Sequence, residues 1–400
     1  MKRKRQKKSD RISELPDHVL LHIIEFMNIK QSVQTCVLSK RWKSLWKSLA
    51  NLTLHHSEKQ KSYICKWFVS QLLARRDNSL PLHSLSYEYD NAADCNKTTL
   101  LEVMEYAASH NVQQLTVIVK LWTIKDLEFP PSIFNSHSLT FLKLDFYYPS
   151  AYGCGKMFPK SLNLPALKTL YLSGLTFTTS NNGCVEPFST CNMLSTLVIV
   201  EWYLQDDAHT LSVSNSNVSS LTIGSAHLCK QAGNFKVVLC TPKLTSLTII
   251  RHPIFSAPSA CNLPFLEEVN INYSQFNYRN DHLIPVSWLQ LLANVKILTL
   301  GFTTLAKMLM VLRNNDSMRN QLPCFVRLKS FKLDVSDVTI SNERIIEMVA
   351  YLLQDSPPLV AIDIIRNADL ITFRFEAANM MDRAIHLEDN GGGGSHVDYN

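Results

Sequence analysis

The first 50 residues place apolar side chains at helical spacing. Seven of the nine residues from Val19 to Met27 are apolar, and no glycine or proline interrupts the chain between Asp17 and Met27. Pro16 and Asp17 suit the first turn of a helix, because proline needs no amide partner there and a carboxylate meets the positive end of the helix dipole. The pattern therefore predicts a helix over residues 16–27.

Two shorter helices are predicted after this one. The second covers residues 31–38 and directs four apolar side chains inward: Val33, Cys36, Val37 and Leu38. The third begins after Ser39, a suitable cap, and repeats apolar residues at helical spacing: Trp42, Leu45, Trp46 and Leu49. Three helices in about 40 residues cannot bury this much apolar surface by themselves. They either pack on the domain that follows or dock on another protein.

From residue 50 onward the apolar pattern becomes a repeat of six positions, of which the first, fourth and sixth are apolar. The first positions are Leu82, Val112, Leu139, Leu167, Leu194, Val218, Leu244, Leu266, Val295, Leu328 and Leu359, with Leu49 beginning a further copy. Leu82 and Leu359 are 277 residues and ten intervals apart, so the mean period is 27.7 residues. This is the period of leucine-rich repeats, in which each copy supplies one short strand and stacked copies bury the leucines between them.

The repeats are irregular, and their connecting segments differ. Helices are predicted for the convex side over residues 62–76, 100–108 and 342–353, and the first of these places four apolar side chains on one face: Ile64, Trp67, Phe68 and Leu72. The asparagine that usually occupies position 9 of a regular repeat is mostly absent from the central copies, so we expect uneven curvature. Alternating apolar residues over 371–375 predict one last strand that caps the array.

Alternation along each strand decides which residues face outward. Positions 5 and 7 point away from the leucines and should line the concave side of the array. Most of these residues are small or uncharged, which favours a protein target held by neutral hydrogen bonds and apolar contacts. Three aromatic residues are candidate anchors for that target: Tyr171, Trp202 and Tyr273. A small-molecule ligand in the array stays open, because no residue pattern defines a pocket for one.

Net charge changes this picture only at the N-terminus. The chain carries a net charge of +6, and residues 1–8 alone contain six lysines and arginines and no acid. From Ile12 onward, 33 basic residues balance 33 acidic ones. A basic face for nucleic acid over the whole folded body is therefore excluded, since phosphate binding needs clustered positive charge. The basic tail is either a nuclear-import signal or a solubilising segment.

Neither a membrane span nor a catalytic or cofactor site is predicted. The apolar run at residues 19–27 is far shorter than the ~20 residues of a spanning helix and lacks a signal-peptide cleavage site. His18 and His22 are four residues apart, but no third metal ligand accompanies them. Glycine-rich phosphate loops and nucleophile elbows are absent, and the ten cysteines have the irregular spacing of reduced thiols. We therefore expect a non-enzymatic protein without a metal or cofactor.

Two segments of the N-terminal module resemble the F-box of the plant F-box/leucine-rich-repeat family. They are Asp10–Ile23 (DRISELPDHVLLHI) and Cys36–Trp46 (CVLSKRWKSLW). The resemblance implies docking on a Skp-family adaptor, which links the protein to a cullin-based ubiquitin ligase. Carried over by position, the adaptor contacts should include Leu15, Pro16, Leu20, Leu21, Ile24, Val37 and Trp42. The connector at residues 28–30 lacks the proline that is common in the family.

These patterns together predict a mixed α/β protein in which a three-helix F-box precedes an irregular leucine-rich-repeat solenoid. The solenoid is a horseshoe with a parallel sheet on its concave side and with helices and loops on its convex side. Its parts are a disordered basic tail (1–9), the F-box (10–49), the solenoid with its cap (50–375), and a C-terminal helix with a flexible glycine-rich tail (376–400).

We expect this protein to be the substrate-recognition subunit of an SCF-type (Skp–cullin–F-box) E3 ubiquitin ligase. The F-box would dock on the adaptor while the repeats hold a protein target for ubiquitination. The alternatives are a non-degradative repeat scaffold and a nuclear nucleic-acid binder. The expected partners are the adaptor, a cullin reached through it and an unidentified protein target, with no membrane. The expected location is the nucleus, the cytoplasm or both.

Overall fold

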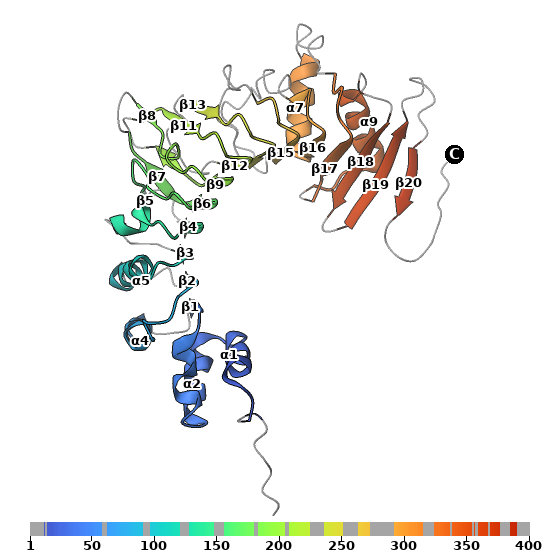
Figure 1. The fold of residues 1–400 in the computed structure, drawn as a ribbon. Helices are drawn as coiled ribbons and strands as arrows, with labels where there is room; N and C mark the ends of the chain where they lie inside the picture. Colours follow the sequence, from blue (N-terminus) through green and yellow to red (C-terminus); the bar gives the residue numbers. More distant parts are fainter. Residues whose placement is uncertain are drawn as a thin grey trace, which may run out of the picture. The chain divides into compact units, whose positions relative to one another are not determined.

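The protein forms two compact units in the computed structural model: Met1–Lys156 with Asn163–Lys168, and Met157–Leu162 with Thr169–Asn400. We refer to them as the N-terminal and C-terminal units (Figure 1). The structure describes residues 12, 14–57, 62–90, 97–120, 128–147, 156–179, 183–204, 208–224, 236–250, 263–272, 292–314, 324–336, 338–353, 356, 359–366, 369–376 and 385–389. No helix in these ranges is long and apolar enough to cross a bilayer. The predicted basic tail lies outside them.

The N-terminal unit begins with short helical segments, which we call the helical module. They are α1 (Asp17–Glu25), α2 (Ile29–Gln34), the 3-10 turn η1 (Thr35–Val37), α3 (Trp42–Leu45) and the 3-10 turn η2 (Trp46–Ser48). The buried apolar side chains of the module include Leu20, Ile24, Trp42, Leu45, Trp46 and Leu49. α1 occupies most of the first predicted helix, and the third predicted helix is confirmed as α3 followed by η2.

The predicted orientation of the second helix is wrong at its end. Val37 and Leu38, which we expected to point inward, are 84% and 64% exposed. Helix α2 begins two residues earlier than predicted, because the side chain of Asn28 caps it by accepting a backbone hydrogen bond from the first turn. The buried side therefore carries different residues: Ile29, Ser32 and Thr35.

Four parallel strands and two helices complete this unit. They are β1 (Asn51–Ser57), α4 (Ser62–Arg75), β2 (Ser84–Asp90), α5 (Lys97–Ser109), β3 (Gln114–Lys120), the 3-10 turn η3 (Pro131–Asn135) and β4 (Phe141–Tyr147). The strands pair in the order β1-β2-β3-β4, and repeat position 4 is in line across them: Leu52, Leu85, Leu115 and Leu142. Helices α4 and α5 lie on the same side of these strands (Figure 1), as predicted for convex helices.

The inner face of α4 differs in part from the predicted one. Leu72 is buried as expected, but Trp67 is 65% exposed. The buried stripe runs instead through Val69, Leu72 and Leu73, which have the i, i+3, i+4 spacing of one helix face. Trp67 lies beside that stripe and faces solvent.

The C-terminal unit contains the other repeat strands. They are β6 (Thr169–Ser173), β9 (Thr196–Val200), β12 (Ser220–Gly224), β14 (Ser246–Ile250), β15 (Glu268–Asn272), β16 (Ile297–Gly301), β17 (Ser330–Asp334) and β18 (Leu359–Arg366). They pair in parallel in this order, in register at position 4: Leu170, Leu197, Leu221, Leu247, Val269, Leu298, Phe331 and Ile362. Every repeat predicted from the apolar pattern is therefore a strand, and positions 4 and 6 are buried in all of them.

The segments between these strands vary from repeat to repeat. Short strands form two further sheets, with the orders β10-β7-β5 and β13-β11-β8. Their bounds are β5 (Lys156–Met157), β7 (Leu175–Phe177), β8 (Cys184–Val185), β10 (Tyr203–Leu204), β11 (Thr210–Ser214) and β13 (Lys236–Cys240). Later connections are helical: α7 (Phe302–Asn314) and α9 (Asn342–Leu352). α9 confirms the helix predicted over 342–353.

Trp202 is a core residue rather than the surface anchor that we predicted. It is 4% exposed, and its ring packs edge-on against Phe177 with the ring centroids 6.4 Å apart. The cause lies at position 8 of two neighbouring repeats, where Gly174 and Glu201 have positive φ values of 69° and 51°. This left-handed conformation turns the chain. The next residue, Leu175 or Trp202, then enters the interior in place of the asparagine of regular repeats.

The C-terminal end closes with antiparallel strands. β19 (Asp369–Glu376) pairs with β18 and confirms the last strand predicted over 371–375, and β20 (Ile385–Asp389) pairs with β19. The helix predicted within 376–400 is wrong for the part that the structure describes, because β20 is a strand. Its backbone pairs with the otherwise open edge of β19, a use of this segment that residue propensity alone does not reveal.

Candidate protein-docking surfaces

The helical module leaves large apolar side chains in contact with solvent. Phe26, at the end of α1, is 80% exposed, and Met27 beside it is also exposed. Val37 and Leu38 form a second exposed pair after η1, and Ile12 is exposed before α1. We call these five residues the apolar surface of the module. Exposed apolar side chains on so small a folded element are typical of a protein-binding site.

The predicted adaptor contacts divide into two groups. Leu15 and Leu21 are half-buried, and Pro16 and Val37 are exposed, so these side chains reach the surface. The other three are buried inside the module: Leu20, Ile24 and Trp42. Buried side chains can influence a partner only by positioning the helices that carry the exposed ones.

Sequence reasoning missed four residues of the apolar surface: Ile12, Phe26, Met27 and Leu38. A signal for Phe26 was available, because it falls outside the stripe of apolar residues that α1 buries at Leu20 and Ile24. No comparable signal existed for Leu38, since its direction depends on where Asn28 starts the preceding helix.

An ion pair joins the two sequence motifs of the module. A guanidinium nitrogen of Arg41 lies 2.6 Å from Asp17 Oδ1. Asp17 is the first residue of α1, and Arg41 directly precedes α3. The pair is solvent-exposed and contributes at most about 1 kcal/mol to stability. Its geometric consequence is that the start of α1 is held beside the start of α3.

Arg76 connects the helical module to the first repeats. Its side chain is 4% exposed, and its guanidinium donates to four backbone carbonyl oxygens at 2.9–3.1 Å: those of Leu49, Asp77, Leu80 and Pro81. Leu49 lies just before β1, whereas the other three belong to the loop after α4. A buried charge is tolerated only when polar groups satisfy it, and carbonyl oxygens accept hydrogen bonds from both terminal guanidinium nitrogens here. Arg76 therefore fastens the end of the module to that loop.

Asp77 adds to the same joint. Its backbone amide donates to the Lys47 carbonyl at 3.3 Å, and its carboxylate accepts hydrogen bonds from the Ser79 hydroxyl at 2.6 Å and the Ser79 amide at 3.0 Å. The hydroxyl hydrogen bond first, and then the amide one, lower the pKa of the Asp77 carboxyl below its ordinary value, and the charges of Arg76 and Lys47 act in the same direction.

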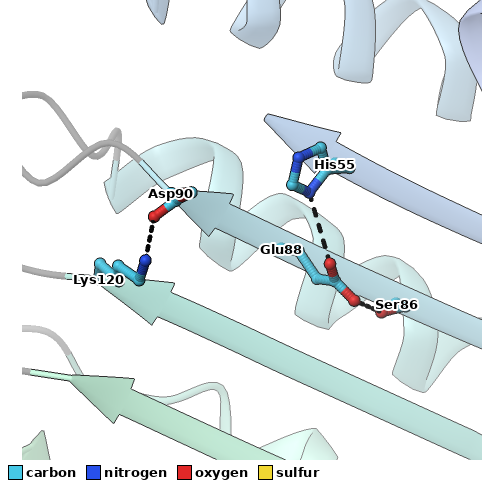
Figure 2. Close-up of polar contacts among 5 residues, drawn as sticks. All are labelled: His55, Ser86, Glu88, Asp90 and Lys120. Atoms are coloured by element: carbon cyan, nitrogen blue, oxygen red, sulfur yellow. Dashed lines mark hydrogen bonds and ion pairs between the residues drawn. The ribbon is translucent and has the colours of Figure 1, made fainter. Parts of the chain in front are cut away.

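Charged side chains on the outward face of the N-terminal strands are paired (Figure 2). His55 Nδ1 on β1 lies 3.4 Å from Glu88 Oε2 on β2, and the other oxygen of Glu88 accepts a hydrogen bond from Ser86 Oγ at 3.4 Å. Lys120 Nζ on β3 lies 2.5 Å from Asp90 Oδ1 on β2. A third pair lies on β4, with its charged atoms 3.6 Å apart: Lys143 and Asp145. Each of these three acids therefore lies beside a basic side chain.

The outward positions of the C-terminal strands carry few charges. From β6 to β16, positions 5 and 7 hold only uncharged residues, and charges return on β17 and β18: Lys332, Asp334 and Asp363. Tyr171 is half-buried at position 5 of β6, on the outward side where we predicted it. Its role as an anchor stays a prediction. Tyr273, the third predicted anchor, lies outside the described residues.

Candidate catalytic and metal chemistry is sparse in the described part of the chain. No group of three or more histidine, cysteine, aspartate or glutamate residues there has an arrangement that could hold a metal ion. His22 Nδ1 lies 3.4 Å from Glu25 Oε2 on the exposed side of α1. Five cysteines in the described part of the chain are free thiols: Cys36, Cys184, Cys191, Cys240 and Cys324.

Two protein families match this chain. Residues 12–54 match the F-box domain, which spans the helical module and part of β1. Residues 100–314, more than half of the chain, match the leucine-rich repeats described as those of FBD-associated F-box protein At5g56370. The chain belongs to the plant F-box/leucine-rich-repeat (F-box/LRR) family. In this F-box/LRR protein the helical module is the F-box, and the parallel strands are the repeats.

Curated relatives from Arabidopsis thaliana carry the same pair of domains in their names. F-box/LRR-repeat protein At4g14103 is 29% identical over 318 residues, which cover 74% of this chain and 79% of the relative. F-box/FBD/LRR-repeat protein At5g18770 is 25% identical over 362 residues, 88% of this chain and 70% of the relative. F-box/LRR-repeat protein At1g55660 is 29% identical over 248 residues, 60% of this chain and 64% of the relative.

An F-box together with leucine-rich repeats has the organisation of a substrate adaptor. F-box domains generally bind Skp-family adaptors, and neither matched family is an enzymatic domain. The structure supplies one candidate surface for each half of that role: the apolar surface of the F-box, and the outward face of the repeat strands.

Proposed function

We propose that this F-box/LRR protein is the substrate-recognition subunit of an SCF-type E3 ubiquitin ligase. The observation that carries the proposal is the apolar surface of the F-box, in which Phe26, Val37 and Leu38 are largely exposed. Burying side chains of this size against a partner stabilises a complex by roughly 1.5–3 kcal/mol each. These exposed residues support docking on a Skp-family adaptor, through which a cullin is reached.

The mechanism is proximity rather than chemistry. The F-box fixes the receptor to the ligase, and the repeats hold a protein target near a ubiquitin-charged enzyme. Tethering raises the effective concentration of target lysines around that enzyme. The receptor needs no nucleophile, metal or cofactor for this task.

The joint at Arg76 supports the same mechanism. Because the guanidinium binds carbonyls on both sides of the joint, the F-box and the first repeats form parts of one compact unit. The first repeat strands are then held in a fixed position relative to the F-box. The nucleus, the cytoplasm or both are the proposed sites of action, with the six basic residues among residues 1–8 as the candidate import signal.

A binding experiment tests the adaptor role. The full chain is co-expressed with a Skp-family adaptor and a cullin, and complexes are purified through a tag on the chain. The double variant Val37→Glu/Leu38→Glu places two carboxylates in the proposed contact, where they lose hydration without a partner. Adaptor affinity should fall at least 100-fold, and the cullin should be lost with it.

Trp67→Glu is the matched control. Trp67 is an exposed apolar residue of the same unit, but it lies on α4, outside the F-box. This variant should bind the adaptor like the wild type. If the wild type binds the adaptor no better than the double variant, the ligase proposal fails and the non-degradative scaffold becomes the better hypothesis.

A further inference from the structure

Positions 5 and 7 of six neighbouring repeat strands carry no charged residue, and Glu268 at position 3 of β15 is the one charged residue on the outward side of these strands. Positions 5 and 7 of β6, β9, β12, β14, β15 and β16 give twelve residues: Tyr171, Ser173, Val198, Val200, Thr222, Gly224, Thr248, Ile250, Asn270, Asn272, Thr299 and Gly301. Nine of these residues are not buried, and protein surfaces are roughly 25–35% charged, so about two or three charged residues would be expected among the nine. We call these twelve positions the neutral face.

Position 5 provides a row of hydrogen-bonding groups across this face. Thr222, Thr248, Asn270 and Thr299 are paired from strand to strand in the parallel register, and all four are half-buried. Neighbouring strands lie ≈ 4.8 Å apart, so the groups recur at that interval. Hydroxyl and amide groups both donate and accept, and they can therefore pair with a backbone or with an uncharged side chain.

Position 7 makes the face low and partly apolar. Gly224 is paired with Ile250, and a Cβ added to Gly224 would lie 3.1 Å from the Ile250 carbonyl oxygen and 3.4 Å from Val200 Cγ1. A Cβ added to Gly301 would lie 2.9 Å from Asn272 Oδ1. Neighbouring side chains thus close over both glycines, and the row presents aliphatic and amide surface without projecting side chains at these two strands.

The chemistry of the neutral face disfavours a charged ligand. A carboxylate or phosphate group placed there would lose hydration and meet no opposite charge, and an ammonium group would find a carboxylate only near β15, where Asp334 accepts a hydrogen bond from Asn272 and Glu268 is exposed. Nucleic acid is a poor match for the same reason, because its phosphates require lysine and arginine. The outward ionisable side chains of β1 to β4, by contrast, already lie beside one another (Figure 2). A charged ligand would have to displace those pairs.

We propose that the neutral face binds an extended segment of the target protein that contains no charged residue over about seven positions. The length follows from five strand intervals of ~4.8 Å divided by ~3.3 Å per extended residue. Serine, threonine, asparagine, glutamine and aliphatic residues fit the row of hydrogen-bonding groups and the aliphatic patches beside it. This inference rests on the proposed function, since it names the class of segment that the substrate receptor recognises.

A peptide selection tests the inference. The full chain, co-expressed with its Skp-family adaptor, is immobilised and used to select from a library of random 12-residue peptides displayed on phage. The expected result is a core of about seven positions in which aspartate, glutamate, lysine and arginine are at least twofold rarer than in the unselected library. A core with charged residues at library frequency or above overturns the proposal.

Charge-insertion variants locate the binding site. Thr248→Arg should weaken binding of the selected peptides at least tenfold, and a new selection on this variant should enrich aspartate and glutamate. Thr248→Glu should do the opposite and enrich lysine and arginine. Thr245→Arg is the matched control, because Thr245 belongs to the same repeat but is exposed before the strand. This variant should bind the selected peptides with the affinity of the wild type.

The outcomes separate this inference from the proposed function. If Thr248→Arg binds the selected peptides as tightly as the wild type, or if no peptide is enriched above that variant, the neutral face is not the binding site. Adaptor binding is measured on every variant, and it should not change with any of them. Loss of the ligase role would appear as failed adaptor binding by the wild type, whatever the peptide result.

Discussion

The F-box leaves several large apolar side chains exposed, whereas the repeat strands bury most of theirs. In the F-box two adjacent pairs, Phe26 with Met27 and Val37 with Leu38, face solvent. In the repeats the apolar residues at positions 4 and 6 are buried in every strand. Each repeat completes its apolar core with side chains of the neighbouring repeats. The F-box has no second copy to stack on, and we expect an adaptor to supply the contacts that it lacks.

This contrast divides the molecule into residues that hold it together and residues that face a partner. A substitution in the repeat core should act on the free energy of unfolding, whereas one on the apolar surface of the F-box should act on affinity. A substitution at Arg76, which joins the F-box to the first repeats, should lower the stability of both, because Arg76 binds backbone carbonyls on each side of the joint. The following predictions test that division, from the largest expected effect to the smallest.

Leu221→Ala should lower the free energy of unfolding by about 3 kcal/mol, because it removes a fully buried side chain from β12 and leaves a cavity. Urea unfolding followed by far-UV circular dichroism measures the change. The neighbouring Thr222→Ala alters an outward, half-buried residue and should cost less than about 1 kcal/mol. Equal losses for the two variants would contradict the assignment of inward and outward positions.

Arg76→Met should destabilise the N-terminal unit by about 2 kcal/mol, since it leaves one buried and three part-buried carbonyl oxygens without their donor. Thermal unfolding measures the loss, and hydrogen exchange should show faster opening of the loop after α4. Arg75→Met is the matched control, because Arg75 is exposed at the end of the same helix. The joint has no special role if the two variants unfold alike.

The sequence predicts those parts of the molecule whose apolar contacts all lie within the chain. Every repeat strand follows from apolar residues at positions 1, 4 and 6, because stacking offers only one way to bury them. Trp202 was misplaced because the positive φ of Glu201 turns it inward, and a glutamate gives no sign of that conformation. The direction of Val37 depends on a single cap at Asn28. Which F-box residues would contact an adaptor depends also on the surface of that adaptor, and this sequence does not encode it.

Phe26→Ala should weaken adaptor binding about tenfold, or ~1.4 kcal/mol, without lowering the stability of the isolated protein. Its side chain is exposed, so its removal leaves no cavity. Isothermal titration calorimetry with the purified adaptor gives the affinity. Leu20→Ala on the same helix provides the contrast, since it should unfold the F-box first and lose binding only as a consequence. Normal adaptor affinity for Phe26→Ala would remove Phe26 from the docking surface.

The smallest expected effect is the loss of stability at acidic pH, when the Asp77 carboxylate becomes protonated. Hydrogen bonds from Ser79 hold its pKa below the unfolded value of about 3.9, so the folded state binds fewer protons in that range. The stabilisation is present above the unfolded pKa and is lost as pH falls through the folded pKa. The gap in thermal midpoint between wild type and Asp77→Asn should therefore stay constant from about pH 7 to 5 and shrink below about pH 4. When both proteins also carry Ser79→Ala, that gap should be smaller, because the hydroxyl hydrogen bond, the stronger of the two, is absent. A gap that does not change with pH would show that the joint depends on the Arg76 carbonyl contacts alone.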